Sequence, residues 1–367
     1  MFAVATEFMT LPTVFREHVM YTESLARVLK YTTMTIVDKT KDLYRNAWIK
    51  FTAWLPHDFN PLHASGPIVA LYLGDLIAGA DARAIGSQII DNASAAISYY
   101  FHLANRSSPT GTEHCKLLRK AADRMLTARK SVCEPITAPE LLLLIQTVLA
   151  QNCTFRDRMH ITLFLLMFVG LFRFDDVSHI LVNTELMQFI SKSDTDLSLD
   201  GVVIYIPHSK MDQNWNGAWV AIGATGKQFC PVQLLRDLLR LGGYATQHST
   251  DDCGPLLRGV RYDFKLKDHR LAQRTASLDS PIPSLSITTF RENIHILVGR
   301  TNITKHIGLH GGRIGGANKA AASGIDSHLV CHLGRWKHGN IFDDTYVRML
   351  AENARPFFEI TRKIWPY

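Results

Sequence analysis

The residues between His310 and Tyr346 combine a cation, ring N–H donors and a phenol. His310 and Arg313 are three positions apart, and Trp336 and Tyr346 follow them. Side chains three apart share one face of a helix, and the start of a helix favours an anion. Arginine donates paired hydrogen bonds to an anion and stays charged, whereas a phenol, with a pKa of about 10, needs such help to act as a nucleophile. This pattern predicts chemistry at a phosphodiester.

Another arginine follows an apolar run upstream. Residues 161–172 are almost all apolar and lead into Arg173, with Asp176 three positions later. The run is too short to span a membrane, so we expect a buried helix that delivers Arg173 to the site. Asp176 is predicted to orient Arg173 or His310, as carboxylates do behind functional groups. A simple salt bridge at the end of the helix is the alternative.

A run of β-branched residues and a second apolar run predict a hairpin. They cover residues 202–206 and 218–222, and the segment between them contains Asn214, Asn216 and Gly217. Lys210 follows the first strand, where a flexible ammonium group can protonate a departing oxygen. A solvated loop lysine is the alternative.

Six residues in this order resemble the active site of tyrosine recombinases, the integrase and Cre-like family. They are Arg173, Lys210, His310, Arg313, Trp336 and Tyr346. The sequences of residues 310–317 and 333–337 most resemble those of the recombinases of Crypton and DIRS mobile elements of eukaryotes. The resemblance covers the whole chain. It implies an all-α, SAM-like N-terminal bundle that binds core DNA, followed by a mixed α+β, mainly helical catalytic domain with a small antiparallel sheet.

The resemblance also implies the reaction. Tyr346 would attack the scissile phosphate, leaving a 3′-phosphotyrosyl bond and a free 5′ hydroxyl, while Arg173 and Arg313 hold the non-bridging oxygens. His310 would assist proton movement and donate to the transition state, and Lys210 would act as the general acid. The reverse reaction with another strand's 5′ hydroxyl rejoins the DNA, so no cofactor, ATP or metal is expected.

The second ring donor is open. The resemblance favours Trp336, but the interval to Tyr346 is longer than expected in the family. His338 and Arg335 are therefore alternative donors. Tyr367 is a nominal alternative nucleophile, but it is the last residue, where chain ends commonly fray.

The N-terminal part is predicted to be a helical bundle. Helices are expected at about residues 67–77, 84–105 and 114–129, with breaks at Ser65-Gly66 and Gly79. A basic run at the end of this bundle is suited to DNA phosphates. It contains Lys116, Arg119, Lys120, Arg124, Arg129 and Lys130. We therefore predict a DNA-binding domain at 1–130, a linker at 131–139 and a catalytic domain with a C-terminal tail at 140–367.

Two further regions carry predictions. Residues 251–284 are rich in charge and turn formers, so an inserted loop is expected, contacting DNA through basic residues. These are Arg258, Arg261, Lys265, Lys267 and Arg270. Large apolar residues near the end, including Phe357, Phe358 and Trp365, must dock on something. Exchange of this tail between protomers, as in the family, and packing within one chain are both open.

Composition is compatible with this interpretation. The 367 residues are 47% hydrophobic, which favours two domains, and the net charge of +7 favours a polyanionic partner. No secretory signal is visible, and six cysteines without a Cys-x-x-Cys pair indicate a reducing compartment. His306/His310 and His328/His332 have a spacing that zinc sites use, but no Glu lies between them and no cysteine pair is near. We expect no metal site.

The predicted partner is double-stranded DNA, with no membrane association. The resemblance implies a dimer on one DNA site and a tetramer in the synapse, in a nuclear protein if the source is eukaryotic and a cytoplasmic one otherwise. The favoured function is a site-specific recombinase, the integrase or transposase of a mobile element. A type IB topoisomerase-like enzyme, a domesticated DNA-binding protein that does not cleave and a metal-dependent nuclease are alternatives.

Overall fold

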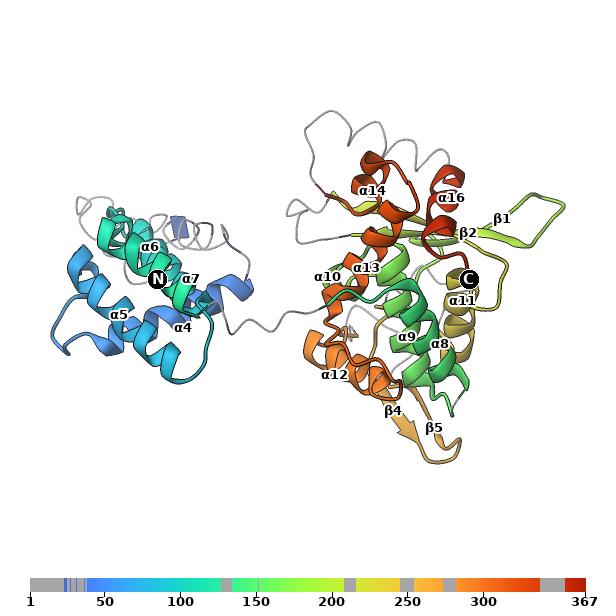
Figure 1. Cartoon of the computed structure of the whole chain (residues 1–367), viewed down its shortest axis with the longest axis horizontal. Coiled ribbons are helices and arrows are strands. Elements are labelled where there is room, and N and C mark those ends of the chain that lie inside the picture. The colour runs from blue at the N-terminus through green and yellow to red at the C-terminus, as the bar shows by residue number, and fades with distance from the viewer. Residues whose placement is uncertain are drawn as a thin grey trace. The chain divides into compact units, whose positions relative to one another are not determined.

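A computed structural model describes most of the chain. The described residues are 38–126, 134–150, 152–207, 216–244, 254–272, 282–336 and 354–367, with five positions between 23 and 36. The chain divides into two compact units, Met1–Ser131 and Val132–Tyr367 (Figure 1). The first is helical and the second is mainly helical with small antiparallel sheets, which confirms the predicted fold class.

The first unit is built from four α-helices and two short 3-10 turns among its described residues. They are α4 (Asp38–Trp54), η1 (Pro61–His63), α5 (Gly66–Ala82), α6 (Gln88–Leu103), η2 (Pro109–Gly111) and α7 (Glu113–Leu126). The side chains of Phe51, Leu73 and Ile97 are buried between these helices, so the unit has a hydrophobic core of its own. Trp48 of α4 stacks on Tyr100 of α6, with 4.6 Å between ring centroids.

The predicted break at Gly79 was wrong. Helix α5 continues through Gly79 to Ala82, because Ile77 and Ala80 keep burying its apolar face. A glycine inside a helix costs only about 1 kcal/mol relative to alanine, which such burial offsets. The break comes at Ala84, whose backbone is left-handed with φ 55°.

The second unit contains the remaining described elements. Its helices are α8 (Ala138–Ala150), α9 (Phe155–Val169), α10 (Phe174–Ser178), α11 (Pro231–Gly242), α12 (Ile287–Val298), α13 (Leu309–Ala322), α14 (Ser327–Leu333) and α16 (Arg355–Ile364). Its strands are β1 (Met187–Ser191), β2 (Leu199–Ile206), β3 (Ala218–Gly223), β4 (Val260–Asp263) and β5 (Asp268–Leu271). None of the described helices of either unit combines the length and apolar character needed to cross a bilayer.

Helix α9 is the centre of this unit. Every residue from Met159 to Val169 is buried, and α8, α11, α12 and α13 pack around the helix (Figure 1). Thr154 and Asp157 form a capping box at its start, and Arg300 donates to both Asp157 oxygens, at 2.9 and 3.3 Å. The predicted buried helix is thus confirmed, but it ends at Val169 rather than Phe172.

The predicted hairpin is also confirmed. Strands β2 and β3 pair antiparallel with Val203 opposite Ala221, and β1 adds a third strand on the other side of β2. The sequence interpretation did not anticipate β1.

The C-terminal tail packs on its own chain in this structure. Helix α16 lies against β3, and Phe358, Ile364 and Trp365 are fully buried. The indole N–H of Trp365 donates to the carbonyl of Phe229 at 3.0 Å, and the main-chain N–H of Gly223 donates to the Thr361 hydroxyl at 2.7 Å. The tail therefore docks, as expected, and its partner here is the sheet.

Part of the predicted linker 131–139 packs within the second unit. Ile136 is fully buried, and its N–H donates to the carbonyl of Gly311 at 3.3 Å. Ala138 and Pro139 already belong to α8. The proposed domain limits stay a prediction.

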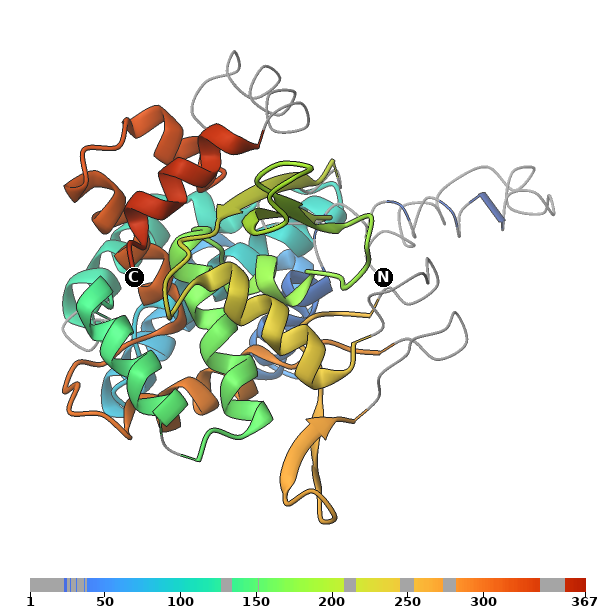
Figure 2. The same cartoon turned by 90° about the vertical axis from the view of Figure 1, so that its right-hand side faces the viewer.

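Residues 254–272 do not form a simple loop. They contain the β4–β5 hairpin, which projects from the unit in both views (Figures 1 and 2). The prediction that Arg258 contacts DNA was wrong, because its side chain is completely buried. Its Nε donates to the carbonyl of Pro255 at 2.6 Å, and its guanidinium lies 4.9 Å from the ring centre of Tyr244.

Candidate active site

Arg173 lies at the start of α10, directly after the chain leaves α9. Leu171, between the two helices, has a left-handed backbone with φ 50°. Such a conformation costs about 1–3 kcal/mol in a branched residue and persists only where surrounding contacts hold it. It is held here because the Leu171 carbonyl accepts a hydrogen bond from Arg313. The turn thus joins the helix that delivers Arg173 to the helix that carries Arg313.

Arg313 lies on α13, whose start at Leu309 confirms the predicted helix opening. Its guanidinium is 1% exposed and donates to the main-chain oxygens of Leu171 and Gly334. Two of its five N–H groups are used in this way.

Glycines let α13 approach its neighbours at this distance. A methyl group at Gly316 would collide with the main-chain oxygen of Phe168 in α9. At Gly315 it would collide with the main-chain oxygen of Ile136. The paired glycines after Arg313 therefore allow backbone-to-backbone packing that fixes the position of α13 on the core.

Asp176 occupies the third position of α10, and its ion-pair partner differs from the predicted one. Its Oδ2 accepts from the main-chain N–H of Arg173 at 2.7 Å, as an acidic residue does in a capping box. The same oxygen accepts from Nη2 of Arg335 at 2.6 Å. The carboxylate therefore pairs with Arg335, rather than with the guanidinium of Arg173 or the ring of His310.

Arg335 was predicted only as an alternative donor, and its ion pair with Asp176 was not predicted. It follows α14, has a left-handed backbone with φ 54°, and its side chain is 12% exposed. Its guanidinium donates to the carbonyl of Leu333 at 3.2 Å and lies 5.0 Å from the ring centre of Phe172. A lone arginine at a helix end carries no sequence signal for such burial, because its partner Asp176 is far away in the chain.

We call Arg173, Arg313, Arg335 and Asp176 the arginine cluster. Burial lowers the pKa of Arg313 to about 9, and the charges of Arg173 and Arg335 add to this lowering. Burial also lowers the pKa of Arg335, despite its contact with Asp176. Three guanidinium groups thus lie near one carboxylate, so the cluster has an excess of positive charge.

Two buried donors of the cluster lack a partner within the described part of the chain, as does one buried acceptor, Oδ1 of Asp176. Nη1 of Arg173 and Nε of Arg335 are buried and have no hydrogen-bond partner among the described residues. Burying a charged donor without an acceptor is costly. Donors of fixed direction and an excess of positive charge together make a site for an anion.

His310 borders this cluster. It is exposed at the first turn of α13. Partial burial, followed by the charges of Arg313 and Arg173, lowers the pKa of its imidazole below the usual value. The ring is therefore neutral near pH 7 and has a nitrogen that can accept a proton.

Trp336 contacts the cluster through its ring face. The guanidinium carbon of Arg313 lies 4.3 Å from the ring centre, a cation–π arrangement. This contact places Trp336 beside the cluster and leaves the choice of second donor a prediction.

Several predicted site residues lie outside the described residues. They are Lys210, His338, Tyr346, Arg129 and Lys130. The structure thus brings together Arg173, His310, Arg313 and Trp336 among the six catalytic predictions. Tyr367, the nominal alternative nucleophile, packs its ring against Trp365 at 5.0 Å.

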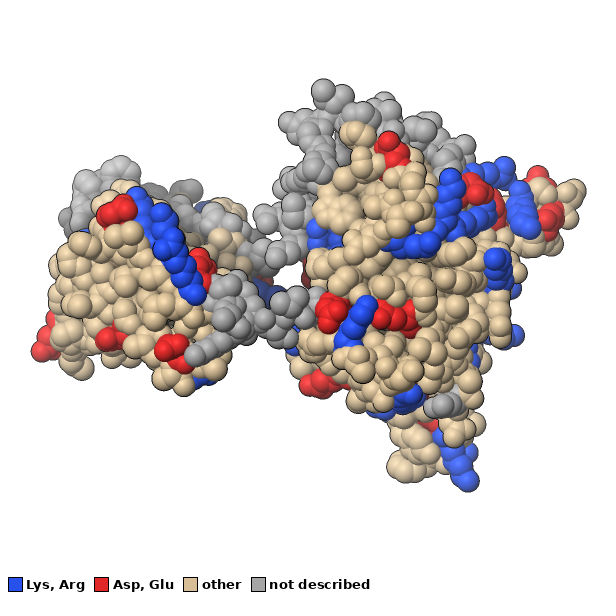
Figure 3. Space-filling view, viewed as in Figure 1, with Lys and Arg blue, Asp and Glu red and all other residues tan. Residues whose placement is uncertain are grey.

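The predicted DNA-binding residues of α7 are mostly exposed. Lys116, Lys120 and Arg124 face solvent, whereas Arg119 is half-buried. A line of Lys and Arg side chains crosses the face of the first unit that is seen in Figure 3. The surface is suited to phosphates, and its role stays a prediction.

The described residues contain no group of three His, Cys, Asp or Glu side chains placed to hold a metal ion. His306 precedes α13, so His306 and His310 do not share a helical face. His328 and His332 both lie on α14.

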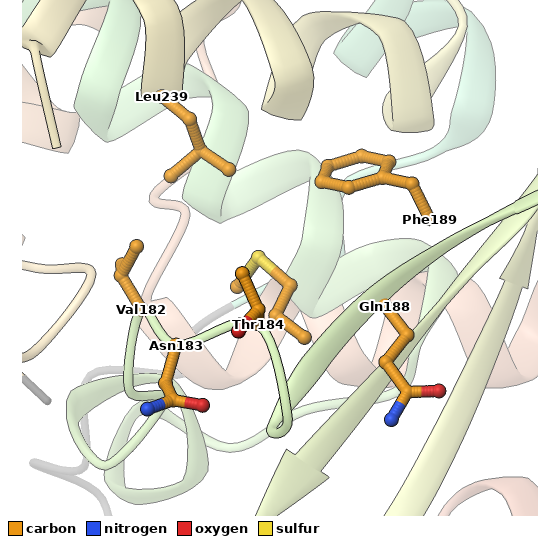
Figure 4. A pocket seen from close by; sticks show the side chains of 7 residues that line it. Val182, Asn183, Thr184, Gln188, Phe189 and Leu239 are labelled. Carbon is orange, nitrogen blue, oxygen red and sulfur yellow. The ribbon is translucent and has the colours of Figure 1, made fainter. Parts of the chain in front are cut away.

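A separate shallow pocket of about 280 Å³ lies beside β1 and α11 (Figure 4). It is lined by Val182, Asn183, Thr184, Met187, Gln188, Phe189 and Leu239. None of these side chains titrates or carries charge, so the lining does not fit phosphodiester chemistry.

Comparison with known proteins adds an independent observation. The chain is 25% identical over 321 residues to an integrase/recombinase xerD homolog of Selenomonas ruminantium, covering 84% of each chain. That relative supports the tyrosine recombinase and integrase family. The Crypton or DIRS type of recombinase stays a prediction. No family model matches the chain.

Solved tyrosine recombinases give structural comparisons. A lambda integrase (75–356) dimer bound to a COC′ core site is 17% identical, with 89% of this chain and 93% of that chain covered and a TM-score of 0.46. The Tn1549 transposon integrase in complex with circular intermediate DNA is 9% identical, with 86% and 94% covered and a TM-score of 0.43.

Proposed function

We propose that this chain is a site-specific DNA recombinase that cleaves and rejoins DNA through a 3′-phosphotyrosyl bond. The observation that carries the proposal is the arginine cluster, in which three guanidinium groups lie near a single carboxylate, that of Asp176, which pairs with Arg335. Two buried donors there have no partner among the described residues. The scissile phosphate is an anion that matches this charge and these donors.

The proposed reaction begins with attack of the Tyr346 oxygen on phosphorus. The bond between phosphorus and the 5′ oxygen breaks, and negative charge develops on the non-bridging oxygens. Arg173 stabilises this charge through its unpartnered Nη1 and Arg313 through the field of its buried guanidinium, because both are in place before the reaction. The cluster thus acts on the transition state rather than on binding alone.

Proton transfers complete this step. The neutral imidazole of His310 accepts the proton of the phenol, consistent with its lowered pKa. Lys210 gives a proton to the departing 5′ oxygen. In the reverse direction, a 5′ hydroxyl of a partner strand attacks the phosphotyrosyl bond and releases Tyr346, so the energy of the phosphodiester is conserved.

The same proposal covers partners and role. Double-stranded DNA is the substrate, and α7 of the first unit contributes phosphate contacts through Lys116, Lys120 and Arg124. Because the solved lambda integrases form a dimer on a core site and a tetramer on a Holliday junction, we infer oligomers of this kind here. The Tn1549 integrase belongs to a transposon, and a mobile-element role is inferred likewise.

Covalent capture tests the proposed function. The full chain, Tyr346→Phe and the matched control Tyr367→Phe are incubated with randomised duplex DNA in EDTA and denatured, and protein–DNA adducts are counted. We expect adducts from the wild type and Tyr367→Phe and none from Tyr346→Phe, because only Tyr346 supplies the attacking oxygen.

The other outcomes identify the alternatives. An adduct from Tyr346→Phe would place the nucleophile elsewhere. DNA binding without any adduct would favour a protein that binds and does not cleave. Trapped DNA that shares one sequence indicates a recombinase, whereas scattered cleavage indicates a topoisomerase-like enzyme. Cleavage that needs a divalent metal would contradict the proposal.

A further inference from the structure

The β4–β5 hairpin is tied to the body of the unit along β5. Leu271 is 2% exposed, and β5 contacts α9. Oδ1 of Asp268 accepts from the main-chain N–H groups of Phe155 at 3.2 Å and His269 at 2.6 Å. The strands pair from Val260–Leu271 outward to Asp263–Asp268. A rigid two-stranded ribbon therefore leaves the body of the unit in a defined direction (Figures 1 and 2).

The far end of this ribbon exposes large apolar groups. Phe264 is 85% exposed, Leu266 61% and Tyr262 45%. The Tyr262 ring meets the rings of Phe264 and His269 edge-on, with centroids 5.1 and 5.4 Å apart. Exposed apolar clusters of this kind on a rigid support are typical of contact surfaces.

Cations surround the apolar tip. Arg261, Lys265 and Lys267 are exposed. Arg261 lies directly opposite Arg270 in the strand register, and like charges in this position destabilise a hairpin. Asp263, which pairs with Arg270, offsets part of this repulsion, and an anionic partner offsets the rest.

The two carboxylates of the hairpin offset only part of this charge. Asp263 accepts from the main-chain N–H groups of Lys265 at 2.9 Å and Leu266 at 3.2 Å, which closes the turn. It also pairs with Arg270 at 3.0 Å. Asp268, in the pair next to the turn, accepts from the main-chain N–H of Phe155 at the start of α9. Four cations against two carboxylates leave the hairpin with net positive charge.

We propose that the β4–β5 hairpin enters a groove of duplex DNA, away from the phosphodiester that the arginine cluster holds. The major groove is about 12 Å wide and admits a two-stranded ribbon. Arg261, Lys265 and Lys267 contact the phosphates along its walls, while Phe264 and Leu266 lie against base edges and sugars. Charge favours DNA over a protein partner. This inference rests on the proposed function.

The test removes charge from the hairpin without touching the cluster. Full-length Arg261→Gln/Lys265→Gln/Lys267→Gln is titrated with duplex DNA over a range of salt concentrations. Each lost phosphate contact lowers the slope of log affinity against log salt by about 0.9, so we expect a decrease of about 2–3. Unchanged melting temperature shows that these exposed changes leave the fold intact.

A matched control removes three exposed cations elsewhere in the same unit. Lys227→Gln/Arg236→Gln/Arg240→Gln makes the same change in net charge at α11 and the segment before it. We expect its salt slope to match the wild type. If the hairpin variant and this control behave alike while the wild type binds DNA, the hairpin proposal is overturned and the proposed function stands. If the wild type does not bind DNA, both fail.

Substitutions in the apolar tip should change DNA affinity without changing its salt dependence. Phe264→Ser/Leu266→Ser should weaken DNA binding by about tenfold, because apolar burial is lost, and leave the salt slope unchanged. Sedimentation of the same variant without DNA is the companion measurement. A change in its mass relative to the wild type, with unchanged DNA affinity, would show that the tip meets a second copy of the chain and would overturn the proposal.

Discussion

The arginine cluster and the β4–β5 hairpin use cations in opposite ways within one unit. Arg313 is 1% exposed and Arg335 is tied to Asp176, whereas Lys265 and Lys267 are solvent-exposed beside Phe264, which is 85% exposed. Buried donors have fixed directions and are little screened by salt. Exposed cations act through their summed field, which salt weakens. The difference separates groups suited to a transition state from groups suited to binding.

Removing the carboxylate of the arginine cluster should have the largest effect on stability. Asp176→Asn keeps an oxygen for the N–H of Arg173 but leaves Arg335 as a buried charge without its ion-pair partner. Such a loss costs about 3–5 kcal/mol in the free energy of unfolding. Chemical denaturation of the wild type and the variant measures it.

An exposed ion pair is the control for this change. Asp42 and Arg45 lie 3.1 Å apart, with both side chains more than 60% exposed. Asp42→Asn should change the unfolding free energy by less than about 1 kcal/mol. Equal losses in the two variants would mean that burial does not set the strength of the cluster's contacts.

Glycine substitutions, with a smaller effect on the free energy of unfolding, test how α13 is positioned. Gly316→Ala places a methyl group against the main-chain oxygen of Phe168 and should destabilise the chain by about 1–3 kcal/mol. Gly74→Ala, in α5, meets no neighbouring atom and should stabilise it by about 0.5–1 kcal/mol. Thermal unfolding of both variants measures the difference. If Gly316→Ala has the sign of Gly74→Ala, close packing of α13 does not hold Arg313.

Local patterns in the sequence were sufficient for part of this fold. A β-branched run and a second apolar run predicted β2 and β3, and the buried apolar run predicted α9. The opening of α13 beside His310 followed from the residues too. These elements depend on their own periodicity, so sequence reveals them.

Contacts between residues far apart in the chain could not be predicted from the sequence. The pairing of Asp176 with Arg335 depends on two segments that only the fold brings together. The left-handed turn at Leu171 contains neither of the residues, glycine and asparagine, that usually indicate this conformation. Arg258 was predicted to be exposed because it lies among charged residues, yet it is fully buried. The β4–β5 strands were hidden by their charged side chains.

A catalytic role of the arginine cluster is tested most directly by measuring the rate of DNA cleavage separately from DNA affinity. The rate of adduct formation is determined for Arg173→Ala at saturating DNA, together with its DNA affinity. We expect a rate lower by about 10²–10³, the cost of one lost transition-state donor, with affinity within a few-fold of the wild type. An unchanged rate at saturation, with or without weaker binding, would contradict a catalytic role for the arginine cluster.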